Sequence, residues 1–418
     1  MMRSVASRKN MPKLLQISIE VNSGSVGRIA EQIGECAILN GWESYITYAR
    51  NHQPSSSKTI RIGNKLDVYW HGVMTRLFDT HCLHSTGATR RLVKQIDEIK
   101  PDIILMHHIH GYFLDMRVLF DYLSRLDTPV VWIFHDCWAF TGHCAHFVSL
   151  GCERWKTGCY DCPAKGQYPA SMWLDRSQKN YIEKRSLFNS LRNLVIVPVS
   201  EWMSSLVKES FLGRQRICTI TNGVDIELFT PRDEQGIART RNRLGITFLD
   251  KIILGVASSW NDNKGLRDFE LLSSKIPHNW RIVLVGLTEQ QIKELPNGII
   301  GIHRTESVEQ LADLYAAADV YVNLTYADTY PTTNLEAIAC GTPVITYRTG
   351  GSPESVTEHT GIVVEQGDLE GVIAAISKIA KCDREALCRR CRTYAESHFD
   401  RRDRFTDYIK LFTELINK

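Results

Sequence analysis

The feature that most constrains the fold is a regular alternation of short apolar segments with longer amphipathic ones. In the first half of the chain, the segments of strand length are rich in apolar and β-branched residues and cover 14–20, 103–107, 130–134 and 194–199. Segments 26–40, 89–99 and 115–125 lie between them and carry apolar residues at helical spacing. Because two parallel strands need a long crossover, usually a helix, this order predicts a doubly wound parallel sheet.

The same alternation restarts in the second half and predicts a second sheet. Six more strand-length segments cover 252–258, 281–286, 299–303, 320–324, 343–347 and 361–365. Turn residues and a proline interrupt the pattern at 222–234, so we place a domain boundary there. We therefore predict an α/β protein with two Rossmann-like domains facing a cleft. The expected bounds are 11–222 for the first domain, 223–395 for the second, and 396–418 for a final helix that packs back toward the first.

Composition excludes several other classes of protein. Hydrophobic residues make up 43% of the 418 and charged residues 23%, which is typical of globular proteins. No apolar run approaches the ~18 residues of a membrane-spanning helix. A net charge of +3 argues against a nucleic-acid partner. Basic residues outnumber acidic ones in residues 1–200, and the reverse holds beyond. That asymmetry is compatible with peripheral contact to an anionic membrane surface, and equally with a solvated surface that has no partner.

The first ten residues (MMRSVASRKN) are basic and are not followed by the apolar stretch of a secretory signal. We expect a disordered leader, with the folded part opening at Met11. Because the chain holds 12 cysteines without such a signal, we predict a reducing, cytoplasmic environment.

The segment 326–343 (YADTYPTTNLEAIACGTP) carries the most chemical information. It places Asp328 and Glu336 on either side of a helix that starts near Pro331, where a proline suits the first turn. The backbone N–H groups at the start of this helix form an anion site with the helix dipole, and we assign it to Thr332, Thr333 and Asn334. One carboxylate can then face a hydroxylated ring and the other a ribose, with a diphosphate between them.

This segment resembles the D/E-x7-E signature of retaining glycosyltransferases of the GT4 type, which have the two-domain GT-B fold. Other pieces occur in the family's order: a glycine-bearing loop at 22–27, His135 after a strand, NGVD at 222–225, Lys264-Gly265, and GGSPE at 350–354. The resemblance covers most of the chain from about Met11. Around HDCWAFTGHC (135–144) the sequence is most similar to transferases of bacterial colanic-acid, capsule or exopolysaccharide assembly.

The resemblance implies a role for each matching residue. Lys264 would face the donor diphosphate, where negative charge builds as the glycosidic bond breaks. Glu336 would accept ribose hydroxyls, and Asp328 would hold hydroxyls of the donor sugar. His135 follows a predicted strand at the edge where open α/β sheets bind ligands, and would contact the donor sugar or the reacting centre.

In the first loop, Gly24 and Gly27 would let the backbone approach the substrate closely. This loop is not G-x-G-x-x-G, which argues against a nicotinamide-binding site. Three histidines close together in the sequence could be metal ligands, but the sequence shows no obvious carboxylate partner for them. We therefore treat them as acceptor-side or structural residues: His107, His108 and His110.

One position departs from the family pattern. The family usually has an arginine six residues before the lysine, where this chain has Ser258. We name Arg304, at the end of a predicted strand, as the first candidate to supply the missing charge.

Five of the 12 cysteines lie within residues 137–162, in a segment without clear periodicity. Four of them form C-x7-C-x6-C-x2-C, and the final C-x2-C is a common half-site of a tetrahedral zinc centre: Cys144, Cys152, Cys159 and Cys162. A Cys-rich insertion at 137–168 needs such a staple, so we favour structural Zn²⁺. Reduced thiols and a disulfide remain alternatives, and His143 or His146 could replace one cysteine.

The favoured function is a retaining glycosyltransferase that needs no cofactor for catalysis. It would move a sugar from a nucleotide diphosphate sugar to a glycan acceptor, expected to be lipid-linked, at the inner face of a bacterial membrane. One rival is a GT-B-fold sugar epimerase, which would lack the carboxylate pair. Another is a catalytically impaired nucleotide-sugar-binding protein, for which Ser258 is the only support.

Overall fold

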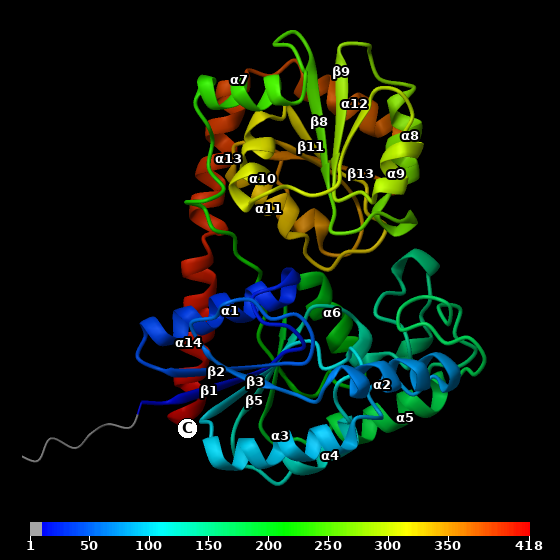
Figure 1. Ribbon diagram of the computed structural model, residues 1–418, viewed down its shortest axis with the longest axis vertical. Coiled ribbons are helices and arrows are strands. Elements are labelled where there is room, and N and C mark those ends of the chain that lie inside the picture. Colours follow the sequence, from blue (N-terminus) through cyan, green and yellow to red (C-terminus); the bar gives the residue numbers. More distant parts are fainter. Residues whose placement is uncertain (1–10) are drawn as a thin grey trace, which may run out of the picture.

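The computed structural model describes residues 11–418, and the basic leader lies outside this range. Two α/β domains are stacked along the long axis of the molecule, each with a central sheet covered by helices on both faces (Figure 1). The predicted fold class, α/β with two doubly wound parallel sheets, is confirmed.

The first sheet has seven parallel strands in the order β3-β2-β1-β4-β5-β6-β7. Their bounds are β1 Lys13–Ile17, β2 Glu43–Tyr48, β3 Lys58–Arg61, β4 Ile103–Met106, β5 Val130–Phe134, β6 Leu194–Pro198 and β7 Arg216–Ile217. The central strands β4, β5 and β6 are buried along their whole length, which explains their continuous apolar sequences. The pattern missed β2, β3 and β7, because β2 (ESYITY) mixes polar and apolar residues without a continuous apolar run, and the other two are short edge elements.

The second sheet has six parallel strands in the order β10-β9-β8-β11-β12-β13. Their bounds are β8 Lys251–Val256, β9 Trp280–Val285, β10 Ile299–Ile302, β11 Val320–Asn323, β12 Val344–Tyr347 and β13 Gly361–Val364. Each sheet reverses its strand order beside a central strand, and open sheets bind ligands outside the carboxyl ends at such a point.

Helices of the first domain are α1 Gly24–Leu39, α2 Lys65–Phe78, α3 Thr86–Ile99, α4 Met116–Leu123, α5 Ser177–Phe188 and α6 Glu201–Glu209. Those around the second sheet are α7 Glu234–Arg243, α8 Leu266–Ser273, α9 Glu289–Glu294, α10 Val308–Ala317, α11 Thr332–Ala339, α12 Leu369–Ile379 and α13 Arg384–His398. The last helix is α14 Arg401–Ile416. Among the residues described, no helix is both long and apolar enough to cross a membrane.

The chain passes between the two domains at two segments that lie side by side. Val224 forms an isolated parallel bridge with Asp400, and a Cβ on Gly223 would meet Arg401 Cα at 2.6 Å. Beyond this crossing, α14 lies against α1 of the first domain, where the rings of Trp42 and Phe412 are 5.9 Å apart (Figure 1).

The Cys-rich insertion follows β5 and contains only short 3₁₀ turns before α5 begins at Ser177. Its start is anchored by the buried Lys184, whose ammonium donates to the carbonyls of Trp138 (2.7 Å) and Thr141 (3.0 Å). The same ammonium lies over the Trp138 ring, 3.4 Å from its centroid. Burial lowers the pKa of Lys184 to about 7.

Candidate active site

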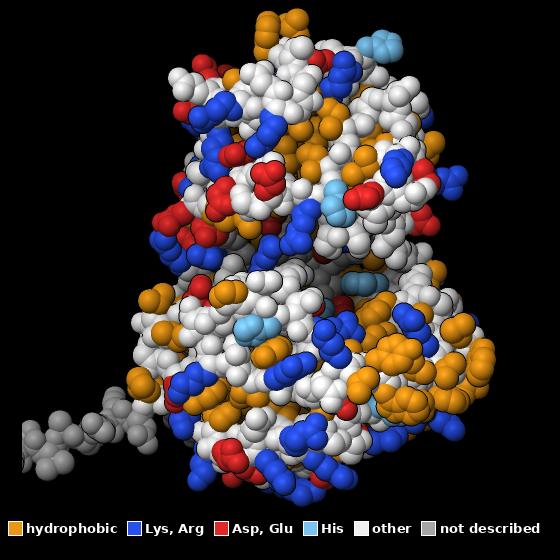
Figure 2. Space-filling view, in the orientation of Figure 1, with side chains coloured by type: hydrophobic (Ala, Val, Ile, Leu, Met, Phe, Trp, Pro, Cys, Tyr) orange, Lys and Arg blue, Asp and Glu red, His pale blue; other side chains and the backbone are white. Residues whose placement is uncertain are grey.

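The loops after β5 and β11 meet across the hollow between the two domains (Figure 2). The Thr329 hydroxyl donates to the carbonyl of His135 at 2.8 Å. Nearby, the Glu354 carboxylate accepts from the backbone N–H groups of Glu201 (2.8 Å) and Trp202 (2.6 Å) in the first turn of α6. A carboxylate at a helix N-terminus is favourable because the helix dipole is positive there. These contacts join the carboxyl edges of the two sheets.

Lys264 and Asp328, 64 positions apart in the sequence, form an ion pair with an Nζ to Oδ2 distance of 2.8 Å. Lys264 follows β8 and Asp328 follows β11, and these two strands are neighbours. Both side chains are partly exposed, at 34% and 20%, so a ligand in the hollow could reach them.

Glycines let three loops pack closely around this pair. A Cβ on Gly265, which has a φ of 73°, would meet the carbonyl oxygen of Leu324 at 2.2 Å. A Cβ on Gly350, which has a φ of 51°, would meet the carbonyl oxygen of Asp328 at 1.8 Å. The Lys264-Gly265 and GGSPE pieces therefore act together, because each provides a glycine that holds a loop in place around the Lys264–Asp328 pair.

Glu336 lies in α11 and is partly buried. Its Oε2 accepts a hydrogen bond from the Tyr315 hydroxyl at 2.9 Å. Burial raises the pKa of Glu336 to about 7, against the opposing effects of Tyr315 and of the positive charge on Arg28. Tyr315 was not identified from the sequence, because its position in the apolar pattern of α10 is typical of an aromatic residue in the core.

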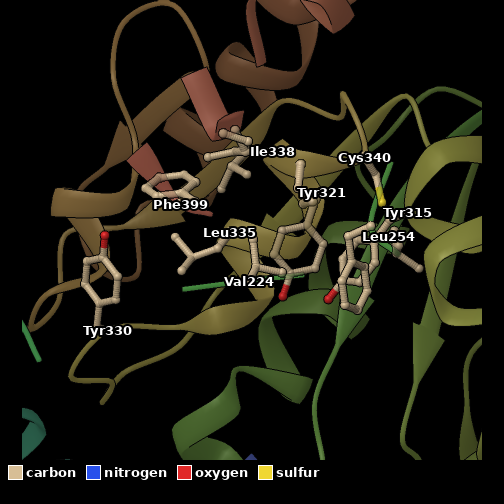
Figure 3. Packing of buried hydrophobic residues seen from close by; sticks show 14 of the residues in the cluster. Val224, Leu254, Tyr315, Tyr321, Tyr330, Leu335, Ile338, Cys340 and Phe399 are labelled. Carbon is tan, nitrogen blue, oxygen red and sulfur yellow. The ribbon is translucent and has the colours of Figure 1, made fainter. Parts of the chain in front are cut away.

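The start of α11 offers fewer backbone donors than predicted. The N–H of Asn334 donates to the carbonyl of Pro331 at 3.2 Å. Its buried side chain accepts from Asn323 and donates to Ser355, both at 2.9 Å. The backbone N–H and the side chain of Asn334 thus both have partners within the protein, and its role in donor binding stays a prediction. Thr332 and Thr333 lie in the first turn of α11, as predicted. Leu335 and Ile338 anchor this helix in the core, between Tyr321 and Phe399 (Figure 3).

His135 belongs to a chain of hydrogen bonds that fixes its tautomer. The Gln16 side-chain amide donates to Ala30 O, so its oxygen accepts from His107 Nε2 at 3.0 Å. His107 Nδ1 is then unprotonated and accepts from His135 Nε2 at 3.2 Å, with the two rings nearly parallel. Burial lowers the pKa of both histidines, so both are neutral near pH 7. His135 Nδ1 is therefore left as a hydrogen-bond acceptor.

His108 and His110, which the sequence analysis grouped with His107, do have a carboxylate partner, contrary to the prediction. Asp136 Oδ2 lies 2.9 Å from His110 Nε2 and 3.3 Å from His108 Nε2. Although burial opposes its ionisation, the charges of His110 and His108 hold the pKa of Asp136 well below its usual range. Within residues 11–418, His108, His110 and Asp136 form the one group of three His, Cys, Asp or Glu side chains whose ligand atoms all lie within 4.8 Å of one another, as in a metal site.

The Cys-rich insertion also contributes to the site. His146 is partly buried, and burial lowers its pKa, while Asp136, Asp328 and Lys264 all act on it electrostatically. The insertion thus places a neutral imidazole near the Lys264–Asp328 pair. The sequence analysis considered His146 only as a zinc ligand.

Cys144, Cys152, Cys159 and Cys162 line one small pocket of the insertion together with His143. All four are free thiols, and no three of their sulfurs, all within the part of the chain described, lie within 4.8 Å of one another. A hydrogen bond between Cys144 and Cys162 lowers the pKa of Cys162. His143 Nδ1 bonds to Asp79 Oδ1 at 2.6 Å, while its Nε2 is buried without a partner. The zinc site stays a prediction.

The remaining predicted residues are Arg304, Gly24 and Gly27, and Arg28 is a further cation that the sequence analysis did not name. Arg304 is exposed after β10, an edge strand separated from β8 by β9. Arg28, on α1, is near enough to Glu336 to act on its pKa. Gly24 has a φ of 62° and opens α1, while a Cβ on Gly27 would meet the backbone of Glu20 at 3.2 Å. The close approach of Gly27 is therefore to the chain itself.

Comparison with known families gives matches over both domains. The profile "Glycosyltransferase Family 4" matches residues 26–228, and "Glycosyl transferases group 1" matches residues 251–382. WcaC of Escherichia coli K12, named as a colanic acid biosynthesis glycosyl transferase, is 24% identical over 85% of this chain and 88% of its own. D-inositol 3-phosphate glycosyltransferase of Corynebacterium jeikeium is 29% identical over 46% of this chain and 50% of its own.

Solved structures agree with the fold. Sucrose-phosphate synthase from Thermosynechococcus elongatus has a TM-score of 0.70 at 16% identity and covers 97% of this chain and 99% of its own. HepE of Anabaena, solved in complex with UDP, has a TM-score of 0.67 at 15% identity and covers 97% of this chain and 100% of its own.

Two parallel-sheet domains stacked across one hollow have the GT-B fold of these solved structures. The two family profiles together span most of the chain, one over each sheet. The chain belongs to the family 4 glycosyltransferases and is similar to WcaC along most of its length.

Proposed function

We propose that this enzyme transfers a sugar, with retention of anomeric configuration, from a nucleotide diphosphate sugar to a glycan acceptor in bacterial surface polysaccharide biosynthesis. The observation that carries the proposal is the Lys264–Asp328 ion pair on the same sheet edge as Glu336. The name of WcaC supports the polysaccharide context, and solved complexes of HepE with UDP and UDP-glucose support a nucleotide sugar donor. The acceptor would be lipid-linked and the enzyme cytoplasmic.

In this proposal, binding of the donor replaces the Lys264–Asp328 ion pair with an ion pair between Lys264 and the diphosphate. The diphosphate draws the Lys264 ammonium away from Asp328, and Asp328 then accepts hydroxyls of the sugar. Lys264, assisted by the N–H groups of Thr332 and Thr333, stabilises the charge that grows on the diphosphate as the glycosidic bond breaks. The neutral His135 accepts a sugar hydroxyl at Nδ1. Arg28 supplies the positive charge that Ser258 does not, with Arg304 as the alternative.

Retention by double displacement would require a free carboxylate as nucleophile. In this proposal Asp328 is occupied by hydroxyls of the sugar once the donor has drawn Lys264 away. Glu336 is hydrogen-bonded to Tyr315, and Asp136 is paired with two histidines. We therefore favour attack of the acceptor hydroxyl on the same face that the diphosphate leaves. The leaving phosphate takes the acceptor proton, and no metal ion is required for the chemical step.

We also propose that the Cys-rich insertion holds one structural Zn²⁺. Four thiols and an unpartnered imidazole nitrogen around one pocket are the ligand types that zinc prefers. Asp79, hydrogen-bonded to the other nitrogen of His143, would orient that imidazole as carboxylates do behind zinc-bound histidines.

Incubation with a panel of nucleotide sugars tests the proposed function. We expect nucleoside diphosphate release from one donor, accelerated by a lipid-linked glycan acceptor, and NMR of the product should show the anomeric configuration of the donor. An inverted product would contradict retention. Binding of donors without transfer to any acceptor would favour the impaired binding protein.

Donor affinity should rise with pH through Glu336. Because the pKa of Glu336 is raised to about 7, the carboxyl is mostly protonated at pH 6 and mostly ionised at pH 8. Hydrogen bonds from ribose hydroxyls to the ionised form are stronger. If only that form binds, affinity increases about tenfold between pH 6 and 8. Calorimetry with an intact nucleotide sugar measures this, since its phosphates do not titrate in that range.

Glu336→Gln is the control for this pH dependence. It should bind the donor more weakly and with an affinity that is the same at pH 6 and pH 8. His107 and His135 are neutral throughout this range because burial lowers their pKa values. A pH dependence that survives in Glu336→Gln would place the titrating group elsewhere.

A further inference from the structure

Large apolar side chains are exposed on one face of the first domain. Three lie on α2 and three in the segment between the Cys-rich insertion and α5, and each is more than half exposed: Leu66, Tyr69, Trp70, Met172, Trp173 and Leu174. We call these six residues the aromatic face. Monomeric proteins rarely expose contiguous apolar patches of this kind unless the patch binds something.

The two halves of the aromatic face are held together by the backbone. The N–H of Met172 donates to the carbonyl of Arg76, in the last turn of α2, at 2.7 Å. Leu66, Tyr69 and Trp70 follow the i, i+3, i+4 spacing of one helix face. The buried residues of α2, His71 and Thr75, belong to its other side. Figure 2 shows hydrophobic side chains gathered at the lower right of the molecule, where Figure 1 places α2.

The chemistry of this face fits a lipid bilayer. Tryptophan and tyrosine combine an apolar ring with a polar group, which suits them to the boundary between hydrocarbon and headgroups. Basic residues stand beside them: Lys65 and Arg76 on α2 are exposed, and the Lys165 ammonium bonds to the carbonyl of Trp173 at 3.4 Å. The one acidic residue of α2, Asp67, caps the start of its own helix. Positive charge around an apolar face is complementary to anionic lipid.

The aromatic face also continues into the active site. Tyr168, at the end of the Cys-rich insertion and 46% exposed, has its hydroxyl 3.3 Å from His110 Nδ1. His110 in turn bonds to Asp136 beside the hollow. A lipid-linked acceptor anchored in a bilayer against this face would present its glycan next to His110 and Asp136.

We infer that the aromatic face is a membrane-docking surface that inserts its side chains into the headgroup region of an anionic bilayer and presents the first domain to a lipid-linked acceptor. The role given to the acceptor rests on the proposed function. Docking itself does not, because it can be measured without donor or acceptor.

Flotation with lipid vesicles tests this inference on the full chain. The wild-type protein should float with vesicles of phosphatidylglycerol and phosphatidylcholine, less with phosphatidylcholine alone, and less at high salt. Trp70→Ser combined with Trp173→Ser should lower the bound fraction about tenfold, since two interfacial rings are lost. The matched control is Phe248→Ser combined with Leu249→Ser, two apolar residues on the second domain that are at least as exposed as Trp70 and Trp173. This control should bind like the wild type.

Donor-driven nucleoside diphosphate release without acceptor should be unchanged in the Trp70/Trp173 variant, which separates docking from the proposed function. Wild-type protein that does not float, or a variant that floats as well as the wild type, would overturn the inference. A protein that forms dimers by light scattering, and whose Trp70/Trp173 variant is monomeric with unchanged vesicle binding, would assign the face to self-association instead.

Discussion

Replacing Lys264 with alanine should lower kcat by about 10²–10³-fold while raising KM much less. The Lys264 ammonium stabilises negative charge on the diphosphate that is largest in the transition state, so its loss lowers kcat more than it raises KM. The effect should lie at the high end of that range for two reasons. Ser258 supplies no second positive charge, and the ion pair at 2.8 Å means that the variant leaves Asp328 without a partner. The bare carboxylate would then repel the incoming diphosphate.

Steady-state kinetics of three more variants complete this test. Lys275→Ala removes an exposed lysine that pairs with Glu370 on the surface of the same domain, so its kinetics should stay close to wild type. Arg28→Ala should give a second loss that overlaps that of Lys264→Ala, because both cations act on one anion and neighbouring effects are not additive. Arg304→Ala is the matching test of the alternative cation. A folded Lys264→Ala enzyme that loses less than about threefold in turnover would place the diphosphate elsewhere.

The zinc centre gives the second large expected effect. Elemental analysis of the purified protein should find about one zinc per chain, and Cys159→Ser should lose both the metal and thermal stability. If the metal contributes about 2 kcal/mol, the Tm of a domain of this size should fall by about 4–8 °C. Cys382→Ser is the control, because Cys382 is exposed and lies outside the insertion.

Two further measurements separate the ligands and the roles of this metal. His143→Asn should weaken zinc binding if the unpartnered Nε2 is a ligand, while leaving the four thiols in place. Brief treatment with EDTA should not abolish transfer, because the metal is structural in this proposal. A metal-free protein with full stability under reducing conditions would reject the centre.

Strand and helix alternation predicted the fold because both sheets are built from continuous apolar strands joined by amphipathic crossovers. The pattern did not predict β2, which mixes polar and apolar residues without a continuous apolar run, or the short edge elements β3 and β7. Edge strands bury less surface, so their sequences carry a weaker apolar signal. The amphipathic helix α2 was missed as well, and its outward apolar residues form half of the aromatic face.

By itself, the sequence determined the two-domain α/β fold and the residues that follow its central strands, including Lys264, Asp328 and His135. Periodicity and motif spacing are local properties, and they sufficed because parallel strands place their carboxyl ends at one edge. Only the tertiary structure decided which of these residues meet. The Lys264–Asp328 pair depends on β8 and β11 being neighbours, and the Asp136 carboxylate reaches His108 and His110 because β4 lies beside β5. The packing of α10 and α11 likewise brings the Tyr315 hydroxyl to Glu336. It also turns the Asn334 side chain into the core, where it bonds to Ser355. Side-chain partners are set by strand order and helix packing, and these act between residues far apart in the chain.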